Sequence, residues 1–305
     1  MTTFKLKVLG CGSALPTMRH HPSSQVLNIN EKLFLLDCGE GTQLQMRKYH
    51  IKFQKIEHVF ISHLHGDHFF GLIGFVSTLH LLGRTKDLHV YGDARLENII
   101  HTQLKASDTF LRYQVIFHPL TPKKSEVLFE DENLVIKSFP LNHRINTWGF
   151  VFREKVKLRN IKRDFLLEYD VPIDVIMDIK AGADFIDENG KLHPNHKITK
   201  TPRSPRSFAY VSDTSYYEPV IEHIKDVHLL YHEATFEASR ENDARNKFHA
   251  TTKQAATIAK AANAQKLLIG HYSARYVDTD FLLEEAKEVF PNTLSANEGL
   301  DIDLR

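Results

Sequence analysis

The sequence predicts a layered α/β protein with two central β-sheets and helices outside them. Short apolar runs typical of strands alternate with helical patterns along most of the 305 residues, and the alternation falls into two similar halves. Sheets covered by helices on their outer faces give this pattern. Between the halves, at about 153–200, the rhythm changes to a highly charged segment punctuated by glycine and proline. That change predicts an inserted arm outside the main core.

The first half begins with strand patterns. In FKLKVLG, residues 4–10, apolar residues alternate with lysines, which is the period of a strand with one buried face. QVLNIN and KLFLLD, separated by a short turn at Asn30 and Glu31, predict a hairpin. The segment GEGT then opens a helix, and we expect Leu44 and Tyr49 to lie on its inner side.

Strands and helices continue to alternate up to the insertion and again after it. EHVFIS predicts a short buried strand, which is followed by a helix from about Phe70 to Leu82. After the insertion, TTKQAATIAKAANA and TDFLLEEAKEVF predict two more helices. A further helix is expected at 94–106, and further strands are expected at 88–92, 113–120, 126–141 (two strands), 148–152, 207–213, 227–234 and 266–273.

Composition and cysteine content indicate the broad class of protein. Hydrophobic residues make up 42% and charged residues 25%, as in soluble globular proteins. No apolar run approaches the roughly 18–20 residues that span a bilayer, and the N-terminus lacks the apolar core of a signal peptide. The only two cysteines, Cys11 and Cys38, provide no disulfide framework. We therefore expect a reducing compartment, the cytoplasm.

Positive charge is concentrated in two segments although the net charge is only +1. Residues 153–163 carry six Lys/Arg against one Glu, and residues 197–206 carry four Lys/Arg and no acidic residue. Such segments are commonly solvated faces or flexible basic loops. The alternative is a surface that contacts phosphates.

The segment ISHLHGDHFFG, residues 61–71, contains a cluster of metal-ligating side chains directly after a buried strand. His63 and His65 are two residues apart, so in an extended chain their imidazoles face the same side. Asp67 and His68 follow where the strand gives way to a helix. A polar surface turn would explain the composition. Four ligand-type side chains in six residues, however, exceed what one zinc ion takes from one loop, and they predict two adjacent metal ions.

Three later strand patterns could supply the remaining ligands. FPLNHR, FAYVSDT and LLIGHYS each stop at a single polar residue of ligand type: His143, Asp213 and His271. Any one of them alone is more often a turn or capping residue. Together with the 61–71 cluster they predict one shared metal centre.

These motifs resemble those of known proteins. SHLHGDH is similar to the HxHxDH signature of the metallo-β-lactamase fold, and the positions of His143, Asp213 and His271 match the remaining ligands of that superfamily. LGCGSALPT, LLDCGEGTQLQMR, the phenylalanine after HGDH, YVSDT, LLYHEATF, FHATTKQAA and IGHYSARY narrow the resemblance to the ribonuclease Z family of tRNA 3′-end processing endonucleases. The resemblance extends over nearly the whole chain.

The resemblance implies a four-layer αββα sandwich and two Zn²⁺ ions, with Mn²⁺ as a possible replacement. One ion would be held by His63, His65 and His143. The second would be held by Asp67, His68 and His271, with Asp213 bridging both. Two metal ions about 3.5–4 Å apart can share a carboxylate and a water molecule, and can lower the pKa of that water to about 7.

The leaving oxygen of a phosphodiester needs a proton, and His249 in KFHATT is the candidate donor. A structural histidine is the ordinary alternative. The resemblance implies a catalytic acid at this motif, oriented by Glu233, and it places Asp67 in the catalytic group as well as among the metal ligands. His232 should point away from the site if its segment is a strand, and we take it as structural.

Substrate contacts are expected outside the metal centre. Arg275 could bind a backbone phosphate and Ser273 is a weaker candidate, although a surface salt bridge would equally explain Arg275. The resemblance implies precursor tRNA as the substrate, an inserted arm that grips the tRNA far from the metal ions, and a homodimer. The arm departs from the family pattern, because DVPIDVIMDIKAG stands where a Gly-Pro element is usual and acidic residues occur at 164–188.

Two other functions remain open at this point. A hydrolase of small esters with the same fold, such as a phosphodiesterase or arylsulfatase, would use the same metal centre, but it would not need an arm. The second alternative is a non-catalytic RNA-binding or scaffold protein with a structural metal site. Structural zinc sites are usually rich in cysteine, and this chain has only two cysteines.

Overall fold

The computed structural model describes residues 3–304 and divides the chain into two compact units. The larger unit comprises 1–129, 136–152 and 206–305, and the smaller comprises 130–135 and 153–205. Each unit has its own buried apolar residues.

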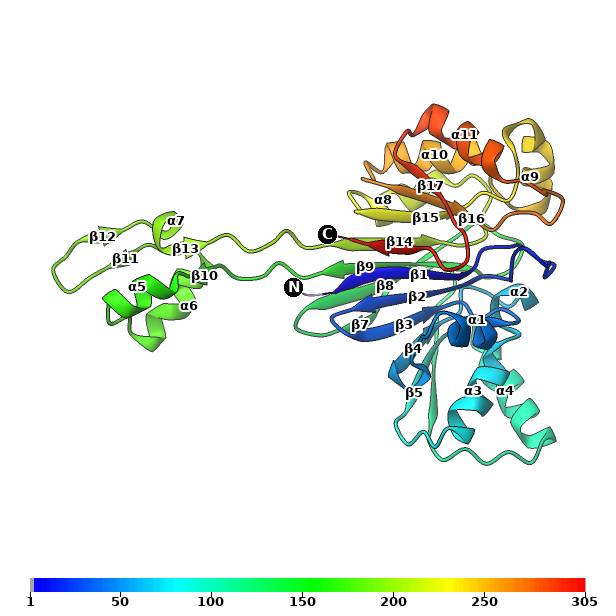
Figure 1. Ribbon diagram of the computed structural model, residues 1–305, viewed down its shortest axis with the longest axis horizontal. Helices are drawn as coiled ribbons and strands as arrows, with labels where there is room; N and C mark the ends of the chain where they lie inside the picture. The colour runs from blue at the N-terminus through cyan, green and yellow to red at the C-terminus, as the bar shows by residue number, and fades with distance from the viewer. Residues whose placement is uncertain (1–2, 305) are drawn as a thin grey trace. The chain divides into compact units, whose positions relative to one another are not determined.

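The larger unit contains two seven-stranded sheets that face each other (Figure 1). The first has the strand order β18-β1-β2-β3-β4-β5-β6, in which β3 to β6 are mutually parallel. Its strands are β1 (Phe4–Gly10), β2 (Ser24–Ile29), β3 (Lys32–Leu36), β4 (Ile56–Phe60), β5 (Leu88–Gly92), β6 (Val115–Pro119) and β18 (Asp301–Asp303).

The second sheet has the order β17-β16-β15-β14-β9-β8-β7, and β14 to β17 are mutually parallel. Its strands are β7 (Glu126–Glu130), β8 (Leu134–Pro140), β9 (Trp148–Glu154), β14 (Ser207–Val211), β15 (Leu229–Glu233), β16 (Leu267–Gly270) and β17 (Thr293–Ser295). Both sheets thus contain a block of parallel strands, whose carboxyl ends are the usual place for functional loops.

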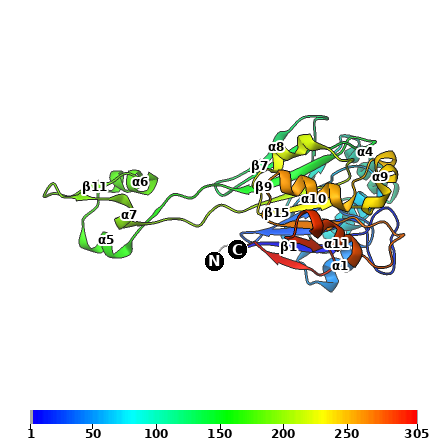
Figure 2. The same ribbon diagram turned by 90° about the horizontal axis from the view of Figure 1, so that it is seen from above.

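Helices cover the outer face of each sheet, which gives the four layers of an αββα sandwich. In Figure 1 the helices α1, α3 and α4 lie outside the first sheet, and α8 to α11 lie outside the second. Figure 2 shows α10 running over the strands of the second sheet. Their bounds are α1 (Thr42–Lys48), α2 (Gly66–Phe69), α3 (Leu72–Leu81), α4 (Arg95–Ala106), α8 (Ile221–Ile224), α9 (Glu241–Lys247), α10 (Thr252–Ala261) and α11 (Asp280–Val289).

This architecture confirms the predicted fold class, and most of the predicted elements are present. The expected hairpin is formed by β2 and β3, with Asn30 and Glu31 both at positive φ in the turn. The helix expected from Phe70 to Leu82 is α3, which is preceded by the short α2. We expected Leu44 to lie on the inner side of α1, and this prediction was wrong, because Leu44 is 69% exposed. Gln45 is buried instead, because its amide donates a hydrogen bond to the carbonyl of Leu9.

The smaller unit is a compact body of short elements. It has two two-stranded sheets, β10 (Asn160–Ile161) with β13 (Thr199–Lys200) and β11 (Phe185–Ile186) with β12 (Leu192–His193). Three helices, α5 (Arg163–Glu168), α6 (Ile173–Ala181) and α7 (Asn195–Ile198), complete it. Its buried residues are Phe165, Ile179, Phe185 and Ile198. The DVPIDVIMDIKAG segment therefore forms α6, for which no helix was predicted.

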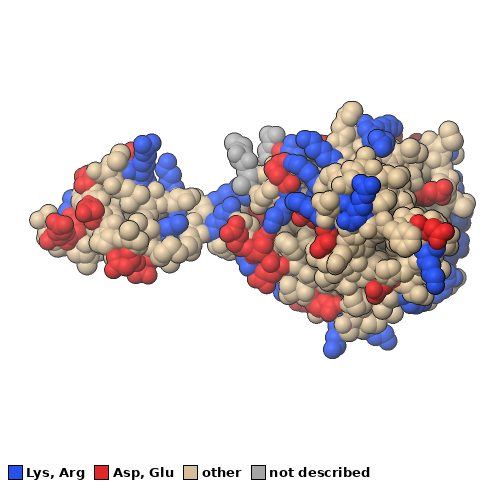
Figure 3. All heavy atoms as spheres, turned by 90° about the horizontal axis from the view of Figure 1, so that it is seen from below, with Lys and Arg blue, Asp and Glu red and all other residues tan. Residues whose placement is uncertain are grey.

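The charges of the smaller unit have both signs. On the face drawn in Figure 3, both basic (blue) and acidic (red) side chains reach its surface. Arg203 of the basic flank donates two hydrogen bonds to the carboxylate of Glu154, each 3.0 Å long. Among residues 3–304, no helix is long and apolar enough to cross a membrane.

Candidate metal centre

Seven ligand-type side chains converge at the carboxyl ends of strands from both sheets. The loop after β4 provides His63 and His65, and α2 provides Asp67 and His68 directly after it. From the second sheet, His143 follows β8, Asp213 follows β14 and His271 follows β16. All seven residues that the sequence suggested as ligands therefore come together, although they are spread over some two thirds of the chain.

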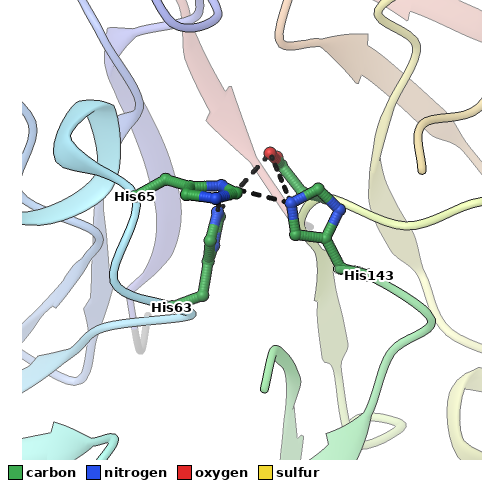
Figure 4. A group of neighbouring side chains, drawn as sticks. His63, His65 and His143 are labelled. Carbon is green, nitrogen blue, oxygen red and sulfur yellow. Dashed lines mark hydrogen bonds and ion pairs between the residues drawn. The ribbon is translucent and has the colours of Figure 1, made fainter. Parts of the chain in front are cut away.

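Three histidines and one carboxylate oxygen form the first group, and Figure 4 shows these histidines pointing toward one another. Nε2 of His63 lies 3.0 Å from Nδ1 of His65, which is 3.2 Å from Nε2 of His143. The Oδ2 atom of Asp213 lies 3.5 Å from Nε2 of His63 and 3.9 Å from Nε2 of His143. Nitrogen and oxygen atoms at these separations can surround one ion.

The second group consists of Asp67, His68 and His271 and uses the other oxygen of Asp213. Nε2 of His68 lies 3.3 Å from both Oδ2 of Asp67 and Nε2 of His271. The Oδ1 atom of Asp213 lies 3.2 Å from Nε2 of His271 and 3.4 Å from Nε2 of His68. Asp213 thus turns one oxygen to each group, as a bridging ligand must.

The Asp213 carboxylate provides a direct test of whether the site suits metal ions. Its Oδ1 atom is buried, yet it accepts no hydrogen bond from residues 3–304. A buried carboxylate oxygen without a partner costs free energy unless a cation or a hydrogen-bond donor compensates it. A divalent cation bound between this oxygen and the neighbouring imidazole nitrogens would compensate it, so the donor set fits two metal ions.

Three of the ligand imidazoles are held in orientation by a hydrogen bond from Nδ1, the ring nitrogen that faces away from the ligand group. Nδ1 of His68 donates to Oδ2 of Asp37 at 2.7 Å, Nδ1 of His143 to the carbonyl of Phe248 at 2.8 Å, and Nδ1 of His271 to Oγ1 of Thr235 at 2.8 Å. When Nδ1 carries the proton, Nε2 keeps its lone pair for a metal ion. Such outer partners orient metal-binding histidines in general.

Among these outer partners, Asp37 accepts several hydrogen bonds besides the one from His68. It directly follows β3 and adopts a positive φ of 52°. Its carboxylate accepts hydrogen bonds from the backbone N–H and the hydroxyl of Ser62 and from the hydroxyl of Tyr210. The hydroxyl of Ser62 in turn lies 3.0 Å from Nδ1 of His63. One buried carboxylate therefore supports ligands of both groups.

The electrostatics of the centre favour positive charge. Burial opposes protonation of His68, but the carboxylates of Asp67, Asp213 and Asp37 outweigh it and raise the pKa of His68 well above its usual value. Burial and the neighbouring histidines lower the pKa of His63, which therefore stays neutral as a metal ligand must. The same carboxylates would attract a divalent cation.

His249 and Glu233 form a separate pair beside the centre. Nδ1 of His249 lies 3.0 Å from Oε1 of Glu233 and 3.9 Å from Oδ2 of Asp213. Burial opposes the charge on His249, but the Glu233 and Asp213 carboxylates outweigh it and raise the pKa of His249 to about 9. A histidine that stays protonated at neutral pH, next to the metal ligands, has the properties of a general acid.

Glu233 is fully buried at the end of β15 and is held by several donors. Oε1 accepts from the backbone N–H groups of Thr214 and Ala250, and Oε2 accepts from the N–H and hydroxyl of Thr235. The preceding residue, His232, is also buried, and its Nδ1 donates to the carbonyl of Glu233.

The chain is similar to named proteins over its whole length. A protein named ribonuclease Z from Phocaeicola vulgatus is 48% identical over 304 residues, covering 100% of this chain and 98% of its own. One from Porphyromonas gingivalis is 45% identical and covers 100% of both chains. The chain belongs to the ribonuclease Z family. The family described as "Anti-Pycsar protein Apyc1" also matches residues 4–161, which include five of the seven ligand-type residues but not Asp213 or His271.

Solved structures give the same assignment. The crystal structure of human tRNase Z, short form, is similar with a TM-score of 0.73 and 26% identity, and 99% of each chain is covered. The metallo-β-lactamase fold protein YhfI from Bacillus subtilis has a TM-score of 0.69 at 20% identity, with 99% of this chain and 100% of that chain covered. At that identity YhfI supports the fold alone.

In this member of the ribonuclease Z family, a cavity of about 710 Å³ opens onto the metal centre. Asp67, His143, Asp213, His249 and His271 all contribute to its wall. Aromatic and basic side chains also line it, namely Phe70, Arg144, Lys247 and Phe248. Five of the seven predicted ligands and the predicted acid therefore face one common space, whereas His63 and His68 are buried behind its wall.

The two predicted substrate contacts lie elsewhere. Arg275 and Ser273 are not among the described residues that line this cavity. Nε of Arg275 donates to the hydroxyl of Ser273 at 3.2 Å, and the exposed guanidinium lies 5.1 Å from the ring centre of Phe236. Among the described residues no carboxylate lies within ion-pair distance of Arg275, so a surface salt bridge does not explain this side chain, which lies over the Phe236 ring instead.

Sequence reasoning missed the outer partners of the ligands. Asp37 lies within the motif LLDCGEGTQLQMR and Thr235 within LLYHEATF, but no role was predicted for either residue. A single aspartate after an apolar run at LFLLD is the same signal that marked Asp213, and it could have identified Asp37. The contribution of Phe248 is a backbone carbonyl, which no residue pattern encodes.

Proposed function

We propose that this protein is a metal-dependent endoribonuclease that removes the 3′ trailer from precursor tRNA by hydrolysing one phosphodiester bond. Cleavage would leave a 3′-hydroxyl on the tRNA and a 5′-phosphate on the trailer. Membership of the ribonuclease Z family supports the substrate and the reaction. The observation that carries the chemistry is the Asp213 carboxylate, which turns one oxygen to each of two ligand groups.

Two divalent ions, zinc or manganese, would be held by the seven residues described above, with Asp213 shared between them. When bound, they would stabilise the negative charge that develops on the phosphoryl oxygens and acidify a water molecule for attack on phosphorus. Asp67 is ligand and catalytic residue at once. It also accepts a 2.7 Å hydrogen bond from the backbone N–H of Ala14, which fixes its carboxylate.

His249 supplies the proton that the leaving 3′-oxygen requires. As the bond between phosphorus and that oxygen breaks, the imidazolium protonates the oxygen, and the tRNA leaves with a 3′-hydroxyl. Glu233 accepts from Nδ1 of His249, so it keeps the ring charged and turned toward the cavity. Positioned acid catalysis typically contributes roughly 10²–10⁴ in rate.

We further propose that the smaller unit, 153–205 with 130–135, acts as a tRNA-binding arm, supported by the basic segments at its ends. Exposed Arg275, with Ser273 beside it, is a candidate for a backbone phosphate away from the cut. A homodimer and a cytoplasmic location complete the proposal. The location is supported by Cys11 and Cys38, which are both buried free thiols.

The test is incubation of the metal-loaded protein with a defined precursor tRNA, with both product ends mapped. A single cut after the unpaired nucleotide that follows the acceptor stem, leaving a 3′-hydroxyl and a 5′-phosphate, is expected. Small chromogenic phosphodiesters should be tested in parallel. Hydrolysis of the small esters alone, without binding of tRNA, would favour the small-ester hydrolase and contradict the proposal.

A further inference from the structure

Two phenylalanines with exposed rings line the cavity of the metal centre. Phe70 is 63% exposed and Phe248 is 37% exposed, and both are part of the cavity wall. Exposing an aromatic ring to water forgoes the free energy of burying it. Exposed apolar side chains beside a catalytic cavity are therefore candidates for binding a ligand.

The backbone holds Phe70 in place at the end of α2. Its ring lies directly over Gly66, so closely that a Cβ built on Gly66 would overlap the ring. The ring also packs edge-on against Phe69 at a centroid distance of 5.0 Å. Because Gly66 belongs to α2, which carries two ligands of the second group, Phe70 is fixed relative to that group.

Phe248 is held by an unusual backbone conformation next to His143. It follows α9 with a φ of +58°, a left-handed conformation that is costly for a bulky residue. Its carbonyl accepts the hydrogen bond from Nδ1 of His143, and its ring lies 6.3 Å from the His143 ring, nearly perpendicular to it. The conformation thus places one carbonyl on a metal ligand and one aromatic ring on the cavity wall.

The two rings are associated with different metal groups. Phe70 belongs to the segment that carries Asp67 and His68, whereas Phe248 contacts His143 of the first group. A phosphodiester bound at the ions that Asp213 would share has one nucleotide on each side. Exposed Arg144 and Lys247 also line the cavity and can balance the charge of flanking phosphates.

We propose that Phe70 and Phe248 are stacking platforms for the two nucleobases that flank the scissile phosphate, one base for each ring. The inference rests on the proposed function and deepens it by naming residues that position the substrate. Stacking requires a base that is free of its helix, because a paired and stacked base has no open face. The rings therefore make the cavity select an unpaired 3′ extension over a duplex, without reading its sequence.

The experiment combines protein variants with abasic substrates. Phe70→Ala and Phe248→Ala are each assayed on precursor tRNA with normal bases, and on precursors lacking the base immediately before or after the cut. On the normal substrate we expect each variant to lower kcat/KM by roughly 5- to 150-fold, the usual contribution of one stacked base. On one of the two abasic substrates, each alanine variant should cleave almost as fast as the wild-type protein. That substrate should differ between Phe70→Ala and Phe248→Ala.

Three controls separate stacking from other effects. Phe110→Ala removes a phenylalanine that is 83% exposed in a different cavity, and it should leave cleavage unchanged. Phe70→Tyr and Phe248→Tyr keep an aromatic ring and should retain most activity. Fluorescent 2-aminopurine at either flanking position should be quenched when metal-free protein binds the precursor, and each alanine variant should abolish one of the two signals.

The outcomes distinguish this inference from the proposed function. If the alanine variants lose no more activity than Phe110→Ala, or lose equally on normal and abasic substrates, the stacking proposal is wrong. An absence of quenching in the wild-type complex overturns it as well, whether or not the RNA is cut. If the wild-type protein leaves every precursor intact while quenching is present, the proposed function fails and stacking stands.

Discussion

At the scale of single residues, His249 is the side chain whose loss should separate chemistry from binding. It lies next to the metal ligands but is not needed to complete either ligand group. We predict that His249→Ala lowers kcat by roughly 10²–10⁴, because the leaving oxygen loses its proton donor. Metal content and affinity for precursor tRNA should stay near the wild-type values, measured by elemental analysis and filter binding.

His101→Ala provides the matched control for this variant. His101 is exposed on α4, where its Nε2 lies 3.7 Å from Glu97 and its ring centre lies 5.8 Å from that of Phe117, away from the metal ligands. Its removal should change neither kcat nor metal content. A His249→Ala protein that cuts precursor tRNA at the wild-type rate would remove the acid from the mechanism.

The Glu233–His249 pair also predicts how activity depends on pH. His249 must be protonated to act, and the Glu233 and Asp213 carboxylates raise its pKa to about 9 despite its burial. Activity should therefore persist at neutral pH and fall as the pH rises through about 9. Bound cations and the nearby His68 oppose the positive charge on His249, so they would shift this fall to a somewhat lower pH. Glu233→Gln should move this alkaline limb to lower pH. An unmoved limb in a folded Glu233→Gln protein would show that another group titrates.

Asp37 should control metal affinity without touching a metal ion. Its carboxylate accepts from Nδ1 of His68 at 2.7 Å, and asparagine tolerates the positive φ found at this position. We predict that Asp37→Asn weakens zinc binding 10- to 100-fold, the usual effect of losing an outer partner. Competition with a chromophoric chelator measures the affinity directly. Unchanged affinity would mean that His68 needs no outer partner.

These residues show how far the sequence predicts the site. The candidate ligands lie at strand ends within short motifs, so spacing and residue type were enough to select seven side chains that the structure brings together. Asp37, Thr235 and the Phe248 carbonyl act through hydrogen bonds to the far side of those ligands. That role depends on ring orientation and on chain geometry, which the order of residues does not reveal.

At the scale of elements, the strands were easier to predict than the short helices. Buried strands such as β14 and β16 are continuous apolar runs, so their pattern is strong. By contrast, α9 (ENDARNK) is polar with one buried residue, Ala244, and it carries no apolar period. The error at Leu44 has a similar origin, because the inward position of α1 is taken by a polar side chain that finds a backbone carbonyl.

The close contact between the loop that contains Gly39 and helix α2 gives a prediction at this scale. Gly39 lies in the loop between β3 and α1, where an added Cβ would overlap the carbonyl oxygen of Asp67 and lie 2.6 Å from Cβ of Pro22. We predict that Gly39→Ala destabilises the protein by about 1–3 kcal/mol, as overpacking does, and weakens metal binding by shifting Asp67. Thermal unfolding and metal titration measure the two effects.

Gly83→Ala is the control for that substitution. Gly83 has a φ of +75° and nothing within 4 Å of an added Cβ, so its replacement costs only backbone strain and leaves metal affinity unchanged. If Gly39→Ala binds metal as tightly as Gly83→Ala, the contact between the Gly39 loop and α2 does not position Asp67.

At the scale of the whole molecule, the chain combines a catalytic sandwich with a separately packed unit. The change in composition after residue 153 marked the insertion in the sequence, but the helix α6 within it was not predicted, because its apolar residues cover a core of only four buried side chains. Basic segments at both ends of the insertion remained visible from composition alone. The structure was needed to show which basic side chains pair with acidic ones within the unit, as Arg203 does with Glu154.

The central claim is that seven side chains hold two divalent ions on which cutting depends. Titration of chelator-stripped protein with zinc, followed by both bound metal and cleavage of precursor tRNA, tests it most directly. We predict that activity returns as two equivalents per chain bind, and that Asp213→Asn prevents this recovery. Full cleavage by the stripped protein, or by a form that holds a single ion, would contradict the account.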